Sequence, residues 1–171
     1  MNIFAIEGDN AGNVDWVKSA QSLDNLRVVK MILESCQILS TVLNEQGIPA
    51  PYKSFNPKHP SCLWAAESSA NFKALIIHTD AMLKEYTVRF GKIHKCDAVL
   101  NKITSLYNKD YFDSHHPTRL RMAMPDFFRG TDVVESYRRY YANKKNMRYP
   151  ADRVPDWFIK YRGSKEYDVI V

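Results

Sequence analysis

The sequence predicts one mostly α-helical domain, a compact multi-helix bundle spanning residues 1–171. The chain has 171 residues, a length typical of a single domain, and 45% of them are hydrophobic. Apolar residues recur with helical spacing in several segments, most clearly in "LDNLRVVKMILESCQIL", Leu23–Leu39. No internal repeat divides the chain. The short apolar alternation in "MNIFAIEG" allows one N-terminal strand or an extended arm.

Capping residues, glycines and prolines set the expected helix boundaries. The Pro-rich segment "IPAPYKSFNPKHP" separates the second and third helical regions as a loop of the kind that often carries function. A long irregular segment with two prolines precedes the final predicted helix. The first expected helix runs from Asp15 or Asn13 to about Leu23, and the second from Asp24 or Ser22 to Gly47. A long helical region follows over 61–89, with a break near Ala70. The last two expected helices span 97–107 and Thr131 through about 145.

Composition excludes several functional classes. The net charge of +5 is compatible with nucleic-acid binding, and the three widely spaced cysteines form no CxxC pair. The chain lacks GxGxxG, GxxxxGK[ST] and GxSxG, and its histidines show no HExxH spacing, so we expect no cofactor and no metal. We find neither a signal-peptide pattern nor a membrane-spanning apolar run, and we expect a cytoplasmic protein, in the host cytoplasm if it is phage-encoded.

A polar stripe runs along the apolar helix at 23–39. Arg27, Lys30, Glu34, Gln37 and Thr41 are three or four residues apart and fall on one helix face. Such a stripe is often only a solvated surface, but apolar residues cover most of the remaining circumference. A semi-buried carboxylate beside basic groups suits acid–base or cation-stabilising chemistry. We therefore take Glu34, Arg27 and Lys30 as candidate catalytic residues and Gln37 as a substrate contact.

A second set of candidates lies in "HPSCLWAAESSANFKALIIHTDAMLKEYTVRFGK". His59, Trp64 and Asn71 could form one wall of a pocket, where Trp64 stacks a base and Asn71 bonds to its edge. Glu85 and Arg89 are four residues apart and can pair on another face. The structural alternative is amphipathic packing with a surface ion pair. All five are predicted substrate-binding residues.

The portion from 118 to 171 is basic and aromatic. Basic residues neutralise phosphates and aromatic rings stack on exposed bases, so "ESYRRYYANKK" is the best nucleic-acid-binding segment of the chain. The alternative is a solvated helix that packs Tyr137 and Tyr141 inward. The predicted nucleic-acid-binding residues are Arg119, Arg121, Arg138, Arg139, Lys144 and Lys145.

Three motifs occur in a family-specific order. They are LDxxRxxKxxxExxQIL at 23–39, HPxxxW at 59–64 and LKEYTVRFGK at 83–92. Over about residues 20–95 this order resembles the pyrimidine dimer DNA glycosylase (endonuclease V-type) family and its small phage-type relatives of unassigned activity. The resemblance implies a compact helical fold, DNA as ligand and a flipped or distorted base as target. It also implies an Arg and a Glu at the scissile sugar, matched here by Arg27 and Glu34.

One departure concerns the nucleophile. The best-known enzymes of this type use an N-terminal amine exposed by removal of the initiator methionine before a small residue, whereas the second residue here is Asn2. The amine of Met1 or a lysine, Lys30 first, would then have to serve. We expect a DNA-binding enzyme acting on a pyrimidine. Two alternatives stay open: a phage thymine-modifying transferase that takes a small amine or amino acid, clamped by Arg27 or Arg89, and a non-catalytic DNA- or nucleotide-binding protein.

Overall fold

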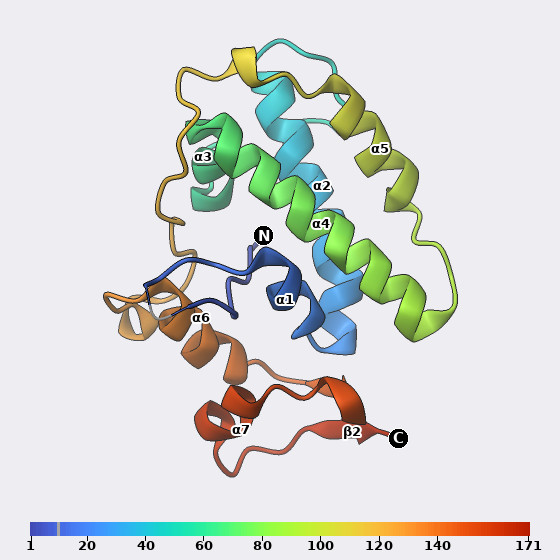
Figure 1. The fold of residues 1–171 in the computed structure, drawn as a ribbon, viewed down its shortest axis with the longest axis vertical. Coiled ribbons are helices and arrows are strands. Elements are labelled where there is room, and N and C mark those ends of the chain that lie inside the picture. Colours follow the sequence, from blue (N-terminus) through green and yellow to red (C-terminus); the bar gives the residue numbers. More distant parts are fainter. Residues whose placement is uncertain (10) are drawn as a thin grey trace.

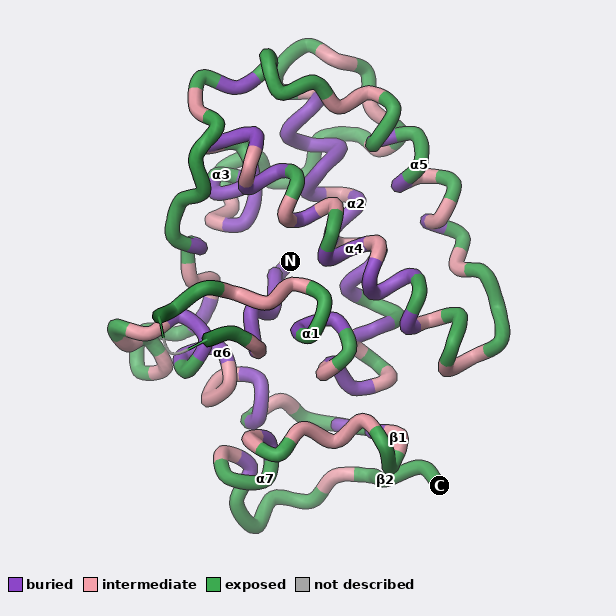
Figure 2. The backbone as a smooth tube through the Cα atoms, in the orientation of Figure 1, coloured by how far each residue is buried: buried purple, intermediate pink, exposed green. Residues whose placement is uncertain are grey.

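The computed structural model of the protein describes residues 1–9 and 11–171. Two long helices, α2 (Asn25–Glu45) and α4 (Ser69–Phe90), pack against each other and form the centre of the fold (Figure 1). The short α1 (Trp16–Gln21) packs on α4, and α3 (Pro60–Glu67) and α5 (Cys96–Leu106) contact both long helices. Buried residues line the facing sides of α2 and α4 (Figure 2). The mostly α-helical fold is as predicted.

The C-terminal portion forms a smaller layer at one end of the helices (Figure 1). It holds α6 (Val133–Ala142), α7 (Asp156–Arg162) and the strands β1 (Arg148–Pro150) and β2 (Asp168–Ile170). The two strands pair in parallel, with Tyr149 opposite Val169. Single 3₁₀ turns occur at Lys109–Tyr111, Asp126–Phe128 and Ala151–Arg153.

Most helix boundaries follow the local sequence signals. The Asp15 carboxylate caps α1 by accepting the Lys18 amide, and the predicted break in the third helical region falls at Ser68, whose hydroxyl caps α4. The predicted cap of the last long helix at Thr131 is wrong. Asp132 caps α6 instead, because its carboxylate accepts the Glu135 amide at 2.7 Å.

The N-terminal segment is an extended arm rather than a strand. Residues 2–6 are buried, and residues 1–8 contribute only one isolated bridge, between Gly8 and Val14. Side chains take the place of a partner strand: the Ser19 hydroxyl accepts the amides of Ile6 and Glu7. The arm therefore runs through the core with the amides of Asn2, Ile3, Ile6 and Glu7 bonded to side chains.

Asp24 joins the C-terminal portion to the start of α2. Its buried carboxylate accepts the Tyr141 hydroxyl at 2.7 Å, the Arg148 amide at 3.2 Å and the Arg27 guanidinium at 3.3 Å. Burial raises the pKa of Tyr141 well above its usual value, so this hydroxyl keeps its proton and donates. Asp24 occupies the N-cap position of α2 without a capping bond, because its carboxylate is directed to these partners.

Removing the Asp24 carboxylate should destabilise the protein strongly. We expect Asp24→Ala to lower the free energy of unfolding by roughly 3–5 kcal/mol, because the half-buried Arg27 loses its carboxylate partner and the buried Tyr141 hydroxyl loses its acceptor. Urea unfolding measures the difference. The control is Asp80→Ala, which breaks an exposed pair with Lys84 and should cost less than about 1 kcal/mol. Equal effects of the two substitutions would contradict the role of Asp24.

A buried histidine makes stability depend on pH. His78 lies in the core of α4, and its Nδ1 donates to the Trp16 carbonyl at 2.8 Å, because a carbonyl can only accept. Burial lowers the pKa of His78 to about 4. Below pH 6.5 the unfolded chain therefore binds a proton at His78 that the folded protein does not bind. The free energy of unfolding consequently decreases as the pH falls.

We expect His78 to remove about 2 kcal/mol of stability between pH 7 and pH 4.5. Urea unfolding at both pH values tests this in the wild type and in His78→Asn. The asparagine amide can still donate to the Trp16 carbonyl but does not titrate. If both proteins lose the same stability over this range, His78 is not the cause.

Candidate active site

The buried N-terminal arm delivers the amino group of Met1 to the middle of α2. The Met1 nitrogen lies 3.8 Å from Oε2 of Glu34, and the Asn2 amide donates to the same oxygen at 3.1 Å. The Asn2 side chain fixes this geometry: its Nδ2 donates to the Ala123 carbonyl at 2.8 Å, and its Oδ1 accepts the Ile3 amide. The arm thus holds an amine against a carboxylate.

Glu34 sits at the edge of the buried face of α2. Its side chain is 15% exposed, while that of Lys30, one turn earlier, is 65% exposed and places Nζ 3.7 Å from Oε1. One carboxylate therefore has two amines within 4 Å, one covered by protein and one reaching into solvent. Glu34 and Lys30 are both predicted catalytic residues.

His59 is the N-cap of α3, and both the Met1 ammonium and the Glu34 carboxylate influence its pKa. Its Nδ1 accepts the Ser61 amide at 3.1 Å, which leaves the proton of the neutral ring on Nε2. Desolvation lowers the pKa of His59, and the nearby Met1 ammonium lowers it further, against an opposing effect of Glu34. The structure thus groups a primary amine, a carboxylate and a neutral imidazole, the groups needed for amine nucleophilic catalysis with proton transfer.

Arg27 lies on the same face of α2 as Lys30 and Glu34 but contacts other parts of the fold. Its guanidinium donates to the Lys145 carbonyl at 2.9 Å and the Asn146 carbonyl at 3.4 Å, as well as to Asp24. At the other end of the stripe, Thr41 is buried and its hydroxyl accepts the Phe55 amide. Gln37 is half-buried between them. The polar stripe is therefore neither a fully solvated surface nor a continuous binding site. Its solvent-accessible part is centred on Lys30 and Glu34.

Trp64 and Asn71 are buried in the core. The Trp64 indole donates to the Thr118 carbonyl at 3.1 Å and packs on Trp16, with ring centroids 5.5 Å apart. The Asn71 amide bonds to the Trp64 carbonyl and to both the amide and the hydroxyl of Thr118. Here the two side chains hold the segment around Thr118 against α3 and α4, so a base would reach Trp64 only after rearrangement.

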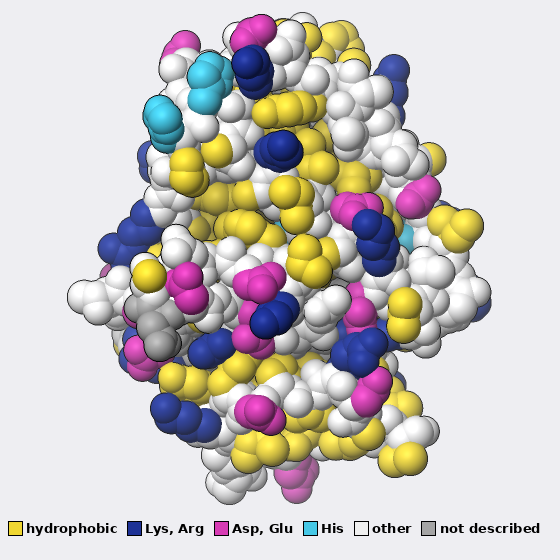
Figure 3. Space-filling view, viewed as in Figure 1, with side chains coloured by type: hydrophobic (Ala, Val, Ile, Leu, Met, Phe, Trp, Pro, Cys, Tyr) yellow, Lys and Arg dark blue, Asp and Glu magenta, His cyan; other side chains and the backbone are white. Residues whose placement is uncertain are grey.

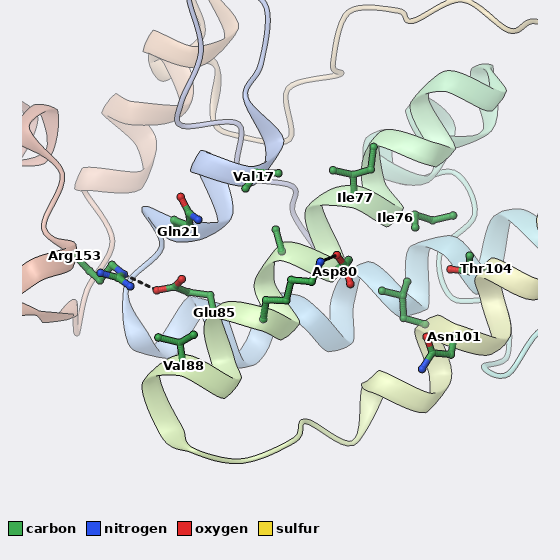
Figure 4. Close-up of a pocket in the computed structure, with 13 residues that line it drawn as sticks. Val17, Gln21, Ile76, Ile77, Asp80, Glu85, Val88, Asn101, Thr104 and Arg153 are labelled. Carbon is green, nitrogen blue, oxygen red and sulfur yellow. Dashed lines mark hydrogen bonds and ion pairs between the residues drawn. The ribbon is translucent and has the colours of Figure 1, made fainter.

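Glu85 and Arg89 form a separate cluster. Glu85 is buried and accepts from Arg89 at 2.8 Å and from Arg153 at 2.6 Å. Arg89 also donates to the carbonyls of Leu23 and Gln21, which anchors the end of α4 to the start of α2. Glu85 and Arg153 border a groove of about 530 Å³ between α1, α4 and α5 (Figure 4). The structure does not join this groove to the residues around Glu34.

The basic side chains of the C-terminal portion mostly contact the protein itself. Arg138 and Arg139 each donate to a backbone carbonyl and pair with a glutamate. Arg119 donates to the Thr131 carbonyl, and Arg121 pairs with Glu67. Lys144 donates to the Tyr140 hydroxyl and lies over its ring. On the face shown in Figure 3, basic and acidic side chains are interspersed. Tyr137 and Tyr141 are buried, as the packing alternative predicted, and phosphate contacts by Arg119, Arg121, Arg138, Arg139, Lys144 and Lys145 remain a prediction.

Comparison with known families gives a match over the N-terminal part of the chain. The sequence profile of the pyrimidine dimer DNA glycosylase family matches residues 1–99. The chain belongs to this family. The matched residues include Met1, Lys30, Glu34 and His59, and membership in the pyrimidine dimer DNA glycosylase family implies a DNA substrate. No curated protein and no solved structure matches the chain significantly.

Sequence reasoning did not identify Asn2 as a site residue. Its role follows from contacts to positions 32 and 121 residues away, for which the sequence carries no local signal. Among the described residues, no group of His, Cys, Asp and Glu has an arrangement suited to a metal ion. Nor does any described helix combine the length and apolar composition needed to cross a bilayer.

Proposed function

We propose that this protein is a DNA glycosylase with lyase activity that acts on pyrimidine dimers through the α-amino group of Met1. The observation that carries the proposal is the 3.8 Å approach of the Met1 nitrogen to the Glu34 carboxylate, inside a chain of the pyrimidine dimer DNA glycosylase family. As a class, α-amino groups lose their proton roughly two pH units below lysine side chains, which favours Met1 over Lys30 as nucleophile.

In the proposed reaction, the lone pair of the neutral Met1 amine attacks C1′ of the damaged nucleotide. The bond from C1′ to the base nitrogen breaks, its electron pair stays on the base, and the base takes up a proton. The attacking nitrogen then loses a proton, and the C1′–O4′ bond opens with protonation of O4′. An iminium between Met1 and C1′ results. Loss of a C2′ proton finally expels the 3′ phosphate by β-elimination.

The surrounding residues have separate roles in this scheme. The Glu34 carboxylate stabilises the positive charge on the attacking nitrogen and at C1′, and it can take the proton that the nitrogen loses. The Nε2 proton of neutral His59 supplies a donor beside the amine. The exposed Lys30 ammonium contacts a flanking phosphate. Asn2 is a positioning residue, since it fixes the arm on which the amine is carried.

Glu34→Gln should separate catalysis from binding. The glutamine can still accept the Asn2 amide but carries no charge, so we expect strand cleavage at the dimer in irradiated duplex DNA to fall at least about 100-fold. Affinity for that DNA should stay within a few-fold. Glu45→Gln, at the exposed end of the same helix, is the matched control and should behave as wild type. Unchanged strand cleavage by Glu34→Gln would contradict the proposal.

Borohydride trapping should identify the nucleophile. Reduction during turnover on irradiated DNA fixes the iminium, and we expect the adduct on Met1 in the tryptic peptide 1–18. Lys30→Gln should still trap, whereas acetylation of the α-amine should abolish trapping. An adduct on Lys30 would reassign the nucleophile. DNA binding without an adduct or strand cleavage would favour the non-catalytic alternative, and a mass gain on thymine would favour the transferase.

A further inference from the structure

The outer face of α2 carries an apolar strip. Leu26, Val29 and Leu33 are 46%, 38% and 41% exposed. They are three and four residues apart, so they follow one another along one side of the helix over about 10 Å. Exposed leucines and valines are common singly, but three in a line on a central helix form a contiguous patch.

The strip adjoins the candidate active site. Lys30 lies on the helix surface between the strip and Glu34, and Leu33 is the chain neighbour of Glu34. The outer face of the later part of α2 is covered, because the loop before α3 bonds to it through the hydroxyls of Ser40 and Thr41. The open part of the outer face is thus the part that borders the Met1 amine.

The size and surroundings of the strip indicate its partner. Three side chains over about 10 Å are too few for a stable protein interface, which buries about 800 Å² on each partner. The length matches about three base steps of duplex DNA at about 3.4 Å each. The minor groove is about 6 Å wide and receives apolar wedges that separate base steps, while neighbouring lysines contact the phosphates. Lys30, beside the strip, is placed for such a contact.

We propose that Leu26, Val29 and Leu33 bind the minor groove beside the damaged nucleotide, and that Leu33 enters the base stack there. This inference rests on the proposed function, because it places the strip on the same DNA that the amine attacks. The strip holds the duplex locally unstacked, so that C1′ of the target sugar can approach Met1. It determines access to duplex substrate rather than the chemical step.

The test compares Leu33→Ser with Ile77→Ser. Ile77 is 42% exposed and lies on α4 in the separate groove, which makes it a matched control (Figure 4). The first measurement is the fluorescence of 2-aminopurine placed next to a thymine dimer in duplex DNA, which rises when a base unstacks. We expect wild type, Glu34→Gln and Ile77→Ser to raise the signal on binding, and Leu33→Ser to raise it little.

The second measurement is strand cleavage at the dimer in duplex and in single-stranded DNA containing the same dimer. Leu33→Ser should slow cleavage of the duplex by about ten-fold or more, because no inserted side chain then compensates for the lost base stacking. Cleavage of the single strand should be unchanged, since no stack has to open. Thermal melting of each variant confirms that the fold is retained.

The outcomes distinguish the two proposals. A wild type that raises the fluorescence but cleaves no strand at the dimer contradicts the proposed function and leaves the strip as a DNA contact. A Leu33→Ser variant that equals wild type on the duplex, or that loses activity equally on both substrates, overturns the inference. Concentration-dependent dimerisation that Leu33→Ser abolishes would also overturn it, because the strip would then bind a second copy of the chain.

Discussion

The contact of the Glu34 carboxylate with the Met1 ammonium and the Asn2 amide is the constraint on which the site depends. An amine at a free chain end would be mobile, and a mobile nucleophile gains little from proximity. Here residues 2–6 are buried, so the packing of the core fixes the position of the amine. The same burial ties the arm to the segment around Ala123, and the site is therefore completed by parts of the chain more than a hundred residues apart.

Asp24 imposes a second constraint, of a structural kind. Its buried carboxylate gathers the start of α2, a tyrosine of α6 and the first strand, and it shares Arg27 with two backbone carbonyls. Arginine can satisfy several acceptors at once because its guanidinium has five donors. This explains how one residue of the family motif at 23–39 can serve the fold while Glu34, two turns later, borders the amine.

The composition of the C-terminal portion does not reveal which of its basic side chains are free. Its basic and aromatic residues suggest a nucleic-acid surface, yet many of its arginines cap carbonyls and pair with glutamates. Charge counted along a sequence does not tell intramolecular ion pairs from free cations. The apolar strip on α2 shows the converse, because its leucines read as core residues in sequence and lie exposed beside the site.

The sequence by itself determined the helical class, most helix boundaries, the family motifs and the stripe that contains Lys30 and Glu34. These follow from local spacing and capping, which depend on residues a few positions apart. The tertiary structure alone decided which part of the stripe is open, that Trp64 and Asn71 hold the Thr118 segment, and that the Met1 amine meets Glu34. Those outcomes depend on partners distant in the chain, and periodicity carries no information about such partners.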